Sequence, residues 1–415
     1  MEENDAHNGE RKPWTLREFG GKTIWDWMGL LIDPVVLSLI TVVFAWRQDI
    51  RQDQIENKRA QEAQKIEGQR AEAERELAEQ RAQDEALQAY LDQMSQLMLE
   101  RKLLEAEPGD PVHTLAQART STVILRLDAE HNESVTRFLS NSGLAESSEA
   151  SARLLSEMAL SHAKLSSAQL PNADLGDADL SGANLSGANL SGASLSGANL
   201  KDADLHNADL KDANLNDANL NDADLNHANL LKADLKDANL FKANLRYAGL
   251  LKADLSDAYL RGAKLFKAFL AEANLNAANL KEATLHGADL DRTKLSDAKL
   301  SDADLSRAYL FKADLSDAKL GLADLHNADV QYADLSFAYL GDAKLSDAKL
   351  GLAKLNYAYL SGADLSGADL SDADGVTNEQ LSTADTLKGA TMPNGQKYEE
   401  WLKDKKAQGK DQKNE

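Results

Sequence analysis

An alanine recurs at every fifth position from Ala163 to Ala373, and a leucine follows two positions later from Leu165 to Leu370, until Gly375 ends the pattern. Thr293 is the only departure from alanine, and Val330 is the only departure from leucine. A period of five matches neither the period of about 3.6 that indicates a helix nor the period of about 2 that indicates a strand. Each unit carries one small and one large apolar side chain and cannot bury them alone. The pattern therefore predicts a solenoid, in which stacked units share one continuous core.

The repeat resembles the signature of the pentapeptide-repeat family, Ala-(Asp/Asn)-Leu-x-x, as in the run Ala183-Asn184-Leu185-Ser186-Gly187. The resemblance implies a mainly β solenoid over residues 161–374, a right-handed quadrilateral β-helix with four pentapeptides per square coil. Alanine and leucine then point inward. Such an array has about ten or eleven coils and is about 50 Å long, at roughly 4.8 Å per coil.

An apolar run from Thr23 to Trp46 follows a polar N-terminal segment, residues 1–22. Tryptophans lie near both ends of the run, as in the aromatic belts of membrane proteins, and its length suits a hydrocarbon core of about 30 Å. Residues 23–46 are therefore predicted to form a single transmembrane helix. Asp33 and Pro34 interrupt it. Either Asp33 makes a polar contact between helices within an oligomer, or it is protonated or locally hydrated while Pro34 kinks the helix.

The charges that flank this run do not fix its orientation. Four basic residues precede it and four follow it closely: Arg11, Lys12, Arg17 and Lys22, then Arg47, Arg51, Lys58 and Arg59. The positive-inside rule therefore gives no preference. We expect a single-pass membrane protein with a cytoplasmic array, and the second expectation rests on analogy with the family alone.

Helices are predicted between the apolar run and the array, and at both ends of the array. Residues 47–107 are rich in Glu, Gln, Arg and Ala, which predicts a long, coiled-coil-like stalk helix. Residues 108–160 are expected to cap the solenoid with short helices, at Val112–Leu127, Ser134–Leu144 and Ser147–Leu160. Residues 375–415 are expected to form a C-terminal cap, with a short helix at Asn378–Leu387 and a disordered charged tail from Lys403 to Glu415.

Composition excludes several chemistries. The chain of 415 residues has a net charge of −22 and no cysteine, so it offers no disulfide and no thiolate. No glycine-rich phosphate loop, metal-ligand spacing or nucleophile constellation occurs, and the asparagine or aspartate before each leucine belongs to the repeat. We expect a protein that is not an enzyme and needs no cofactor or metal.

Residues twenty apart are expected to stack on neighbouring coils, which arranges the surface into columns. One column is acidic: Asp217, Asp237, Asp257, Asp297 and Asp317. Beside it runs a stripe of cations and large apolar residues: Leu231, Lys232, Leu251, Lys252, Arg292, Phe311 and Lys312. The stripe either lies against anionic lipid headgroups or is an ordinary solvated face with lysines lying over apolar neighbours.

Aromatic and apolar residues gather on adjacent sides of the last coils, and they are Tyr332, Phe337, Tyr339, Leu352, Tyr357 and Tyr359. Exposed apolar clusters tend to mark interfaces. Some relatives in the family dimerise through their C-terminal coils. The cluster is therefore either a homodimer interface or a set of aromatic ladders that stiffens the rod.

These features favour a membrane-anchored interaction or scaffold protein that presents a rigid rod to an unknown protein partner. A homodimer through the C-terminal coils or the stalk is compatible with them. The alternative is a DNA mimic that inhibits a type II topoisomerase, as some family members do. A basic column beside the acidic one disturbs such mimicry, and a nucleic-acid partner is not expected.

Overall fold

The computed structural model describes residues 24–146 and 153–411. The expected polar segment 1–22 lies outside the described residues. The chain divides into two compact units, residues 1–81 and 82–415. Helix α1 (Ile24–Arg101) runs through the boundary between them and contains Pro34. Among the described residues it is the one helix long and apolar enough to cross a membrane, by length and composition alone, with an 18-residue window of mean hydropathy 2.2 that is fully exposed.

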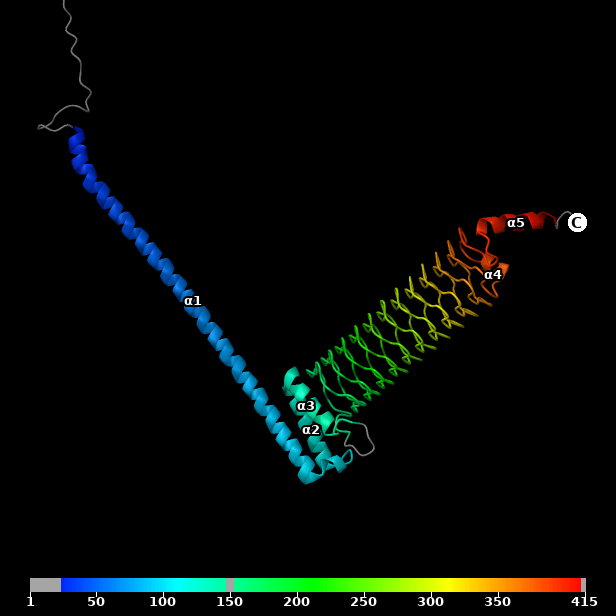
Figure 1. The fold of residues 1–415 in the computed structure, drawn as a ribbon, viewed down its shortest axis with the longest axis horizontal. Helices are drawn as coiled ribbons and strands as arrows, with labels where there is room; N and C mark the ends of the chain where they lie inside the picture. The colour runs from blue at the N-terminus through cyan, green and yellow to red at the C-terminus, as the bar shows by residue number, and fades with distance from the viewer. Residues whose placement is uncertain (1–23, 147–152, 412–415) are drawn as a thin grey trace, which may run out of the picture. The chain divides into compact units, whose positions relative to one another are not determined.

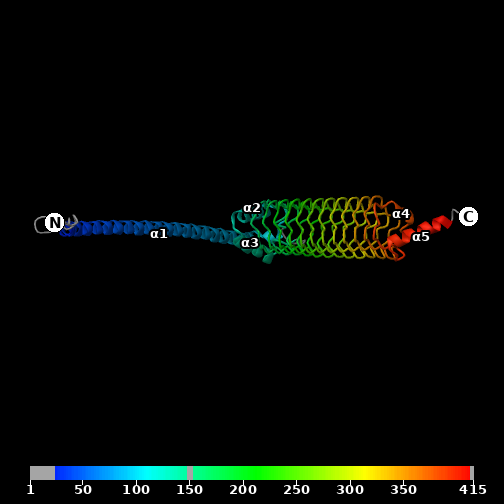
Figure 2. The same ribbon diagram turned by 90° about the horizontal axis from the view of Figure 1, so that it is seen from above.

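The solenoid is a stack of square coils of twenty residues (Figures 1 and 2). Each position before a leucine forms a parallel bridge with the residue twenty places later, from Ala159↔Asp179 to Lys354↔Asp374. A side of the square holds one pentapeptide, so the backbone is extended for too short a stretch to form a named strand. Successive coils are joined by backbone hydrogen bonds such as Leu165 N–H to Asn184 O at 2.7 Å. The same regular ladder continues along the whole array.

The alanines and leucines of the repeat fill the inside of every coil and are essentially inaccessible to solvent. The residues that interrupt the repeat remain compatible with this core. Val330 is fully buried, and Thr293 satisfies its hydroxyl by donating to Leu270 O at 2.9 Å. A buried hydroxyl without such a bond would be costly.

An N-terminal cap covers the first coil. It comprises the C-terminal part of α1, the short 3₁₀ helix η2 (Leu103–Glu105), α2 (Pro111–Arg126) and α3 (Ala129–Asn141). Tyr90, Met94 and Leu97 of α1 are buried inside this cap, where Tyr90 meets Phe138 edge-on with ring centroids 6.3 Å apart. Asn132 ties the cap to the array, because its side-chain amide donates to Ile124 O, Leu127 O and Lys164 O.

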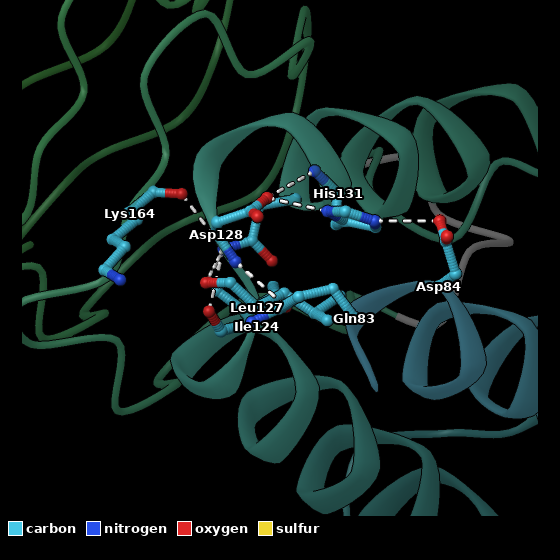
Figure 3. A network of polar contacts seen from close by, with 8 residues as sticks. Gln83, Asp84, Ile124, Leu127, Asp128, His131 and Lys164 are labelled. Atoms are coloured by element: carbon cyan, nitrogen blue, oxygen red, sulfur yellow. Dashed lines mark hydrogen bonds and ion pairs between the residues drawn. The ribbon is translucent and has the colours of Figure 1, made fainter. Parts of the chain in front are cut away.

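A polar network joins three elements of the cap (Figure 3). Asp128 caps the N-terminus of α3 by accepting from the backbone N–H of His131 at 3.0 Å. The imidazole of His131 contacts Asp128 Oδ1 through Nδ1 at 2.7 Å and Asp84 Oδ1 of α1 through Nε2 at 3.1 Å. The cap of α3 at Asp128 also explains why this helix begins five residues before the predicted Ser134.

The predicted helix Ser147–Leu160 is wrong over its described part, 153–160. This segment is the beginning of the first coil: Leu155 and Leu160 are buried in the core, and Glu157 has a positive φ of 56°. Residues 147–152 lie outside the described residues.

The C-terminal prediction also needs correction. Helix α4 (Asn378–Ser382) is shorter than the predicted Asn378–Leu387, and the chain then forms one more, irregular coil, in which Asp364 pairs with Thr386. Gln380 closes the edge by donating to Leu355 O and Ala358 O. Helix α5 (Tyr398–Asp411) replaces the expected disorder from Lys403 as far as Asp411.

Candidate interaction surface

Three positions of each pentapeptide face outward: the residue before the leucine and the two residues after it. The residue before the leucine is commonly Asp or Asn, and its side chain accepts a hydrogen bond from the backbone two residues later. Asn184 Oδ1, for example, accepts from Ser186 N–H at 3.0 Å. This Asx-type bond turns the corner of the coil, so much of the acidity of the rod has a structural cause.

The second residue after each leucine lies in the left-handed region, with φ near 57° at Asp217 and Asp237. Glycine, asparagine and aspartate tolerate this conformation best. The predicted acidic column occupies this position. All five of its aspartates, Asp217, Asp237, Asp257, Asp297 and Asp317, are exposed, and none forms an ion pair with another described residue.

The cations of the predicted membrane-surface stripe are mostly engaged by neighbours. Lys252 Nζ lies 3.3 Å from Glu272 Oε2, and Arg292 Nη1 lies 3.6 Å from Asp291 Oδ2. Lys312 lies over the ring of Phe311, 5.1 Å from its centroid. Lys232 and Leu251 are exposed, whereas Leu231 is half-buried. The stripe therefore presents less free positive charge than its sequence suggests.

Four of the six residues of the predicted C-terminal cluster form two aromatic stacks. Phe337 stacks on Tyr357 with centroids 5.1 Å apart, and Tyr339 stacks on Tyr359 at 4.8 Å with an interplanar angle of 6°. All four rings are exposed, Tyr357 to 77%. We call these four residues the aromatic platform.

Glycines next to the platform allow one of its rings to lie close to the backbone. A Cβ placed on Gly341 would come within 2.7 Å of the Tyr339 hydroxyl, and one on Gly321 within 2.8 Å of the same ring. Leu322, which follows Gly321, is 58% exposed and adds to the apolar surface of these coils. Leu322 was missed in the sequence because it stands in a column of mostly polar residues.

Two members of the predicted cluster lie elsewhere. Tyr332 and Leu352 stand five residues before Phe337 and Tyr357, which is one full side of the coil. The ion pair of Lys354 with Asp334, at 3.1 Å, occupies the side between them. Tyr332 packs instead against Phe311 of the stripe, with centroids 5.2 Å apart. The structure therefore brings four of the six predicted residues together.

A groove that the sequence analysis missed lies on the side of the coil opposite Tyr339 and Tyr359. It has a volume of about 760 Å³ and is bordered by the exposed rings of Phe269 and Tyr309. Both rings stand in the column before the leucines, with Asp289 between them. Reading that column in steps of twenty would have revealed the pair.

In the parts of the chain that the structure describes, no group of three or more His, Asp or Glu side chains could hold a metal ion. The histidines of the array instead make local contacts. His206 bonds to Asp204, and His286 bonds to Ser306.

The comparisons with known proteins agree with this architecture. A model of the pentapeptide-repeat family matches in eight copies, over residues 159–197, 178–217, 218–250, 253–292, 288–327 and 333–372. The chain belongs to the pentapeptide-repeat family, and pentapeptide repeats imply a right-handed β-helix. No curated protein matches the chain.

Several solved structures are similar to the array. HetL, a pentapeptide repeat protein involved in heterocyst differentiation regulation from the cyanobacterium Nostoc sp. strain PCC 7120, is 42% identical, with a TM-score of 0.44; the match covers 52% of this chain and 91% of HetL. Full-length QnrB1, a plasmid-mediated fluoroquinolone resistance protein, is 16% identical, with a TM-score of 0.32, over 49% of this chain and 90% of QnrB1. A pentapeptide repeat protein from the Arabidopsis thaliana thylakoid lumen is 26% identical, with a TM-score of 0.16, over 35% of this chain and 83% of its own.

Proposed function

We propose that this protein is a non-enzymatic, membrane-anchored interaction protein whose solenoid presents a rigid binding surface to a protein partner. The aromatic platform is the observation that carries the proposal. Four exposed rings in two neighbouring columns form an apolar surface on a coil whose remaining outward positions are largely polar. Contiguous exposed apolar surface of this kind marks interfaces, and aromatic residues are enriched at their centres.

Anchoring through residues 23–46 is part of the proposal. The exposed apolar window of α1 supports it, although a signal sequence satisfies the same criteria of length and composition. The array then lies on one side of the bilayer, and by analogy with the family we place it in the cytoplasm. The partner at the platform is either a second copy of this chain or a different protein.

Site-specific photo-crosslinking in native membranes tests the platform. A photoreactive phenylalanine analogue at position 357 of the full-length chain should give a defined protein adduct, whose mass distinguishes a homodimer from another partner. Position 217 is a matched control, because it lies in the same column with the same φ of 57°. Equal adduct yields at the two positions would contradict the proposal.

A DNA mimic that inhibits a type II topoisomerase is the second candidate, and only the acidic column favours it. Asp217, Asp237 and Asp257 place carboxylates on consecutive coils, as a mimic of regularly spaced phosphates requires. Beyond Asp317 the same column changes to Phe337 and Tyr357, which ends the charge pattern. Inhibition of gyrase supercoiling by the full-length protein would establish this function in place of the first.

A further inference from the structure

The groove opposite the platform has the composition of a site for a planar cation. Two of its walls are the rings of Phe269 and Tyr309, which are 54% and 58% exposed. Both pair through parallel bridges with Asp289 of the intervening coil, so they lie two coils apart, about 10 Å. Neither ring stacks on another aromatic side chain within the described ranges 24–146 and 153–411. A cation midway between them would lie about 5 Å from each ring, within the reach of a cation–π interaction.

The floor of the groove offers carboxylate oxygens that are not fully used. Asp289 Oδ1 accepts from the backbone N–H of Asp291 at 3.1 Å, and Asp289 forms no ion pair with a described residue. Asp291 is less available, because its Oδ2 faces Arg292 at 3.6 Å and its Oδ1 is shielded from solvent. Asp289 is therefore the carboxylate that a ligand can reach, and a donor on the ligand would be favoured there.

The cations that line the groove stand on one rim, and on the opposite side Arg292 and Lys312 are already engaged by Asp291 and Phe311. Lys267 and Arg307 stand in one column with Gly287 between them, and the glycine leaves that rim open. Lys267 is already engaged over the ring of Phe266, 5.4 Å from its centroid. The rim of the groove carries cations and its floor carries a carboxylate. This arrangement favours a ligand whose cationic tip reaches the floor and whose hydrogen-bond acceptor, such as a backbone carbonyl or a carboxylate, lies at the rim.

We propose that this groove binds an arginine side chain of a protein partner. The guanidinium lies between Phe269 and Tyr309 and donates to the carboxylate of Asp289, while Arg307 faces an acceptor on the backbone of the partner. A guanidinium is favoured over an ammonium because it is planar, weakly hydrated and carries several donors in a fixed plane. A phosphate is disfavoured because the floor is anionic. The site does not rest on the platform, which lies on the opposite side of the coil.

Binding of a minimal probe to the full-length chain in detergent micelles tests the proposal. The probe is N-acetyl-arginine amide, observed by saturation-transfer NMR, and its neutral isostere N-acetyl-citrulline amide is the control ligand. The arginine probe should bind about tenfold more tightly than the citrulline probe. Asp289→Asn and Tyr309→Ala should each remove most of that difference.

Asp209→Asn is the matched control variant, because Asp209 stands in the same column and its Oδ1 accepts the same type of backbone bond, from Lys211 at 3.1 Å. Asparagine occupies this column at Asn189 and Asn229, so neither substitution disturbs the coil. Asp209→Asn should leave arginine binding unchanged. Equal affinity for the two probes, or an equal loss in Asp209→Asn and Asp289→Asn, would overturn the proposal. Binding of adenosine monophosphate in place of arginine, lost in Tyr309→Ala, would also overturn it.

Discussion

Each pentapeptide places some side chains in the core and others on the surface. The difference is clearest where the same residue type occurs in both places. Leu255 points into the core and is fully buried, whereas Leu251, four residues earlier, is 39% exposed. The first leucine belongs to the repeat and the second occupies an outward position beside Lys252. The same residue type therefore contributes to the core in one place and to a surface in the other.

The matched pair Leu255→Ala and Leu251→Ala measures this difference. Leu255→Ala should cost about 2–5 kcal/mol, since it removes buried methyl groups and leaves a cavity in a tightly packed coil. Leu251→Ala should change stability by no more than about 0.5 kcal/mol. Because a solenoid is stabilised mainly by contacts between neighbouring coils, the loss should appear locally. Hydrogen exchange detected by mass spectrometry should show faster exchange in the coils around residue 255 only; similar exchange in the two variants would show that the assignment of inward and outward positions is wrong.

Bulky residues at the left-handed position are costly to the backbone. Leu322, Tyr332 and Phe337 have φ values of 61°, 60° and 60° there. This conformation costs on the order of 1–2 kcal/mol for residues with a Cβ. Phe337 offsets part of that cost by stacking on Tyr357, and Tyr332 by packing on Phe311.

At the scale of elements, the junction of α1 with α3 depends on the protonation of one histidine. Both ring nitrogens of His131 face carboxylates, Asp128 Oδ1 and Asp84 Oδ1, so both contacts are donated only by the imidazolium. Burial lowers the pKa of His131, but the bonds and charges of Asp128 and Asp84 outweigh it, and the net pKa is raised. The pKa of Asp128 is lowered: burial raises it, but the bonds from His131 and the charges of His131 and Lys164 prevail.

We expect the docking of α1 on α3 to weaken as the solution becomes alkaline. The contribution of His131 is fully present below its ordinary pKa of 6.5 and is lost as the pH rises through its raised value. The contribution of Asp128 acts in the opposite range, because it is lost only as the pH falls through its lowered pKa. Hydrogen exchange of residues 82–101, corrected for the intrinsic effect of pH, should therefore lose protection as the pH rises above the ordinary histidine pKa of 6.5.

His131→Gln provides the control for this prediction. Glutamine keeps a donor but does not titrate, so protection of residues 82–101 should be lower than in the parent chain at pH 6 and independent of pH up to 9. Residues 177–200 of the array, which lie away from this junction, should show no pH dependence in either chain. A pH dependence of residues 82–101 that persists in His131→Gln would assign it to another group.

The limits of sequence reasoning are also clearest at this scale. The five-residue repeat predicted the array because every unit has the same environment in the fold. The local sequence pattern and the tertiary contacts therefore indicate the same structure. The first coil was mistaken for a helix because Met158 stands where the repeat has alanine. Leu155 and Leu160 nevertheless occupy the leucine positions of the repeat. The last coil was missed because Asp364 pairs with a residue 22 places later, not 20, and a fixed period cannot follow an insertion.

The candidate sites were predictable to the extent that the columns were. Stacking of Phe337 on Tyr357 follows directly from a step of twenty. The separation of Tyr332 from Phe337 does not, because it depends on which residues occupy the side between them. The pairing of Arg292 with Asp291 involves neighbours in sequence whose directions only the backbone conformation defines.

At the scale of the whole solenoid, a stack of coils has two open ends, and each end exposes backbone groups that can pair with another chain. The first coil is closed by the cap of α2 and α3, where Asp174 N–H donates to Ala145 O at 2.7 Å. At the other end, Leu365 N–H and Leu370 N–H donate to Thr386 O and Thr391 O of the irregular coil, each at 2.9 Å. Leu381 and Met392 complete the core beneath it.

Removing the C-terminal cap should therefore convert the rods into end-to-end assemblies. Truncation after Asp374 takes away the acceptors of Leu365 and Leu370 and exposes the leucines of the last regular coil. Truncation after Asp404 keeps Leu381, Met392 and Trp401 and is the control. Both chains carry Tyr357→Asp, so that association through the aromatic platform does not contribute. Negative-stain electron microscopy of the detergent-solubilised proteins should show rods joined at their ends only after the first truncation. Single rods in both samples would mean that the edge of the last coil is protected by something other than the cap.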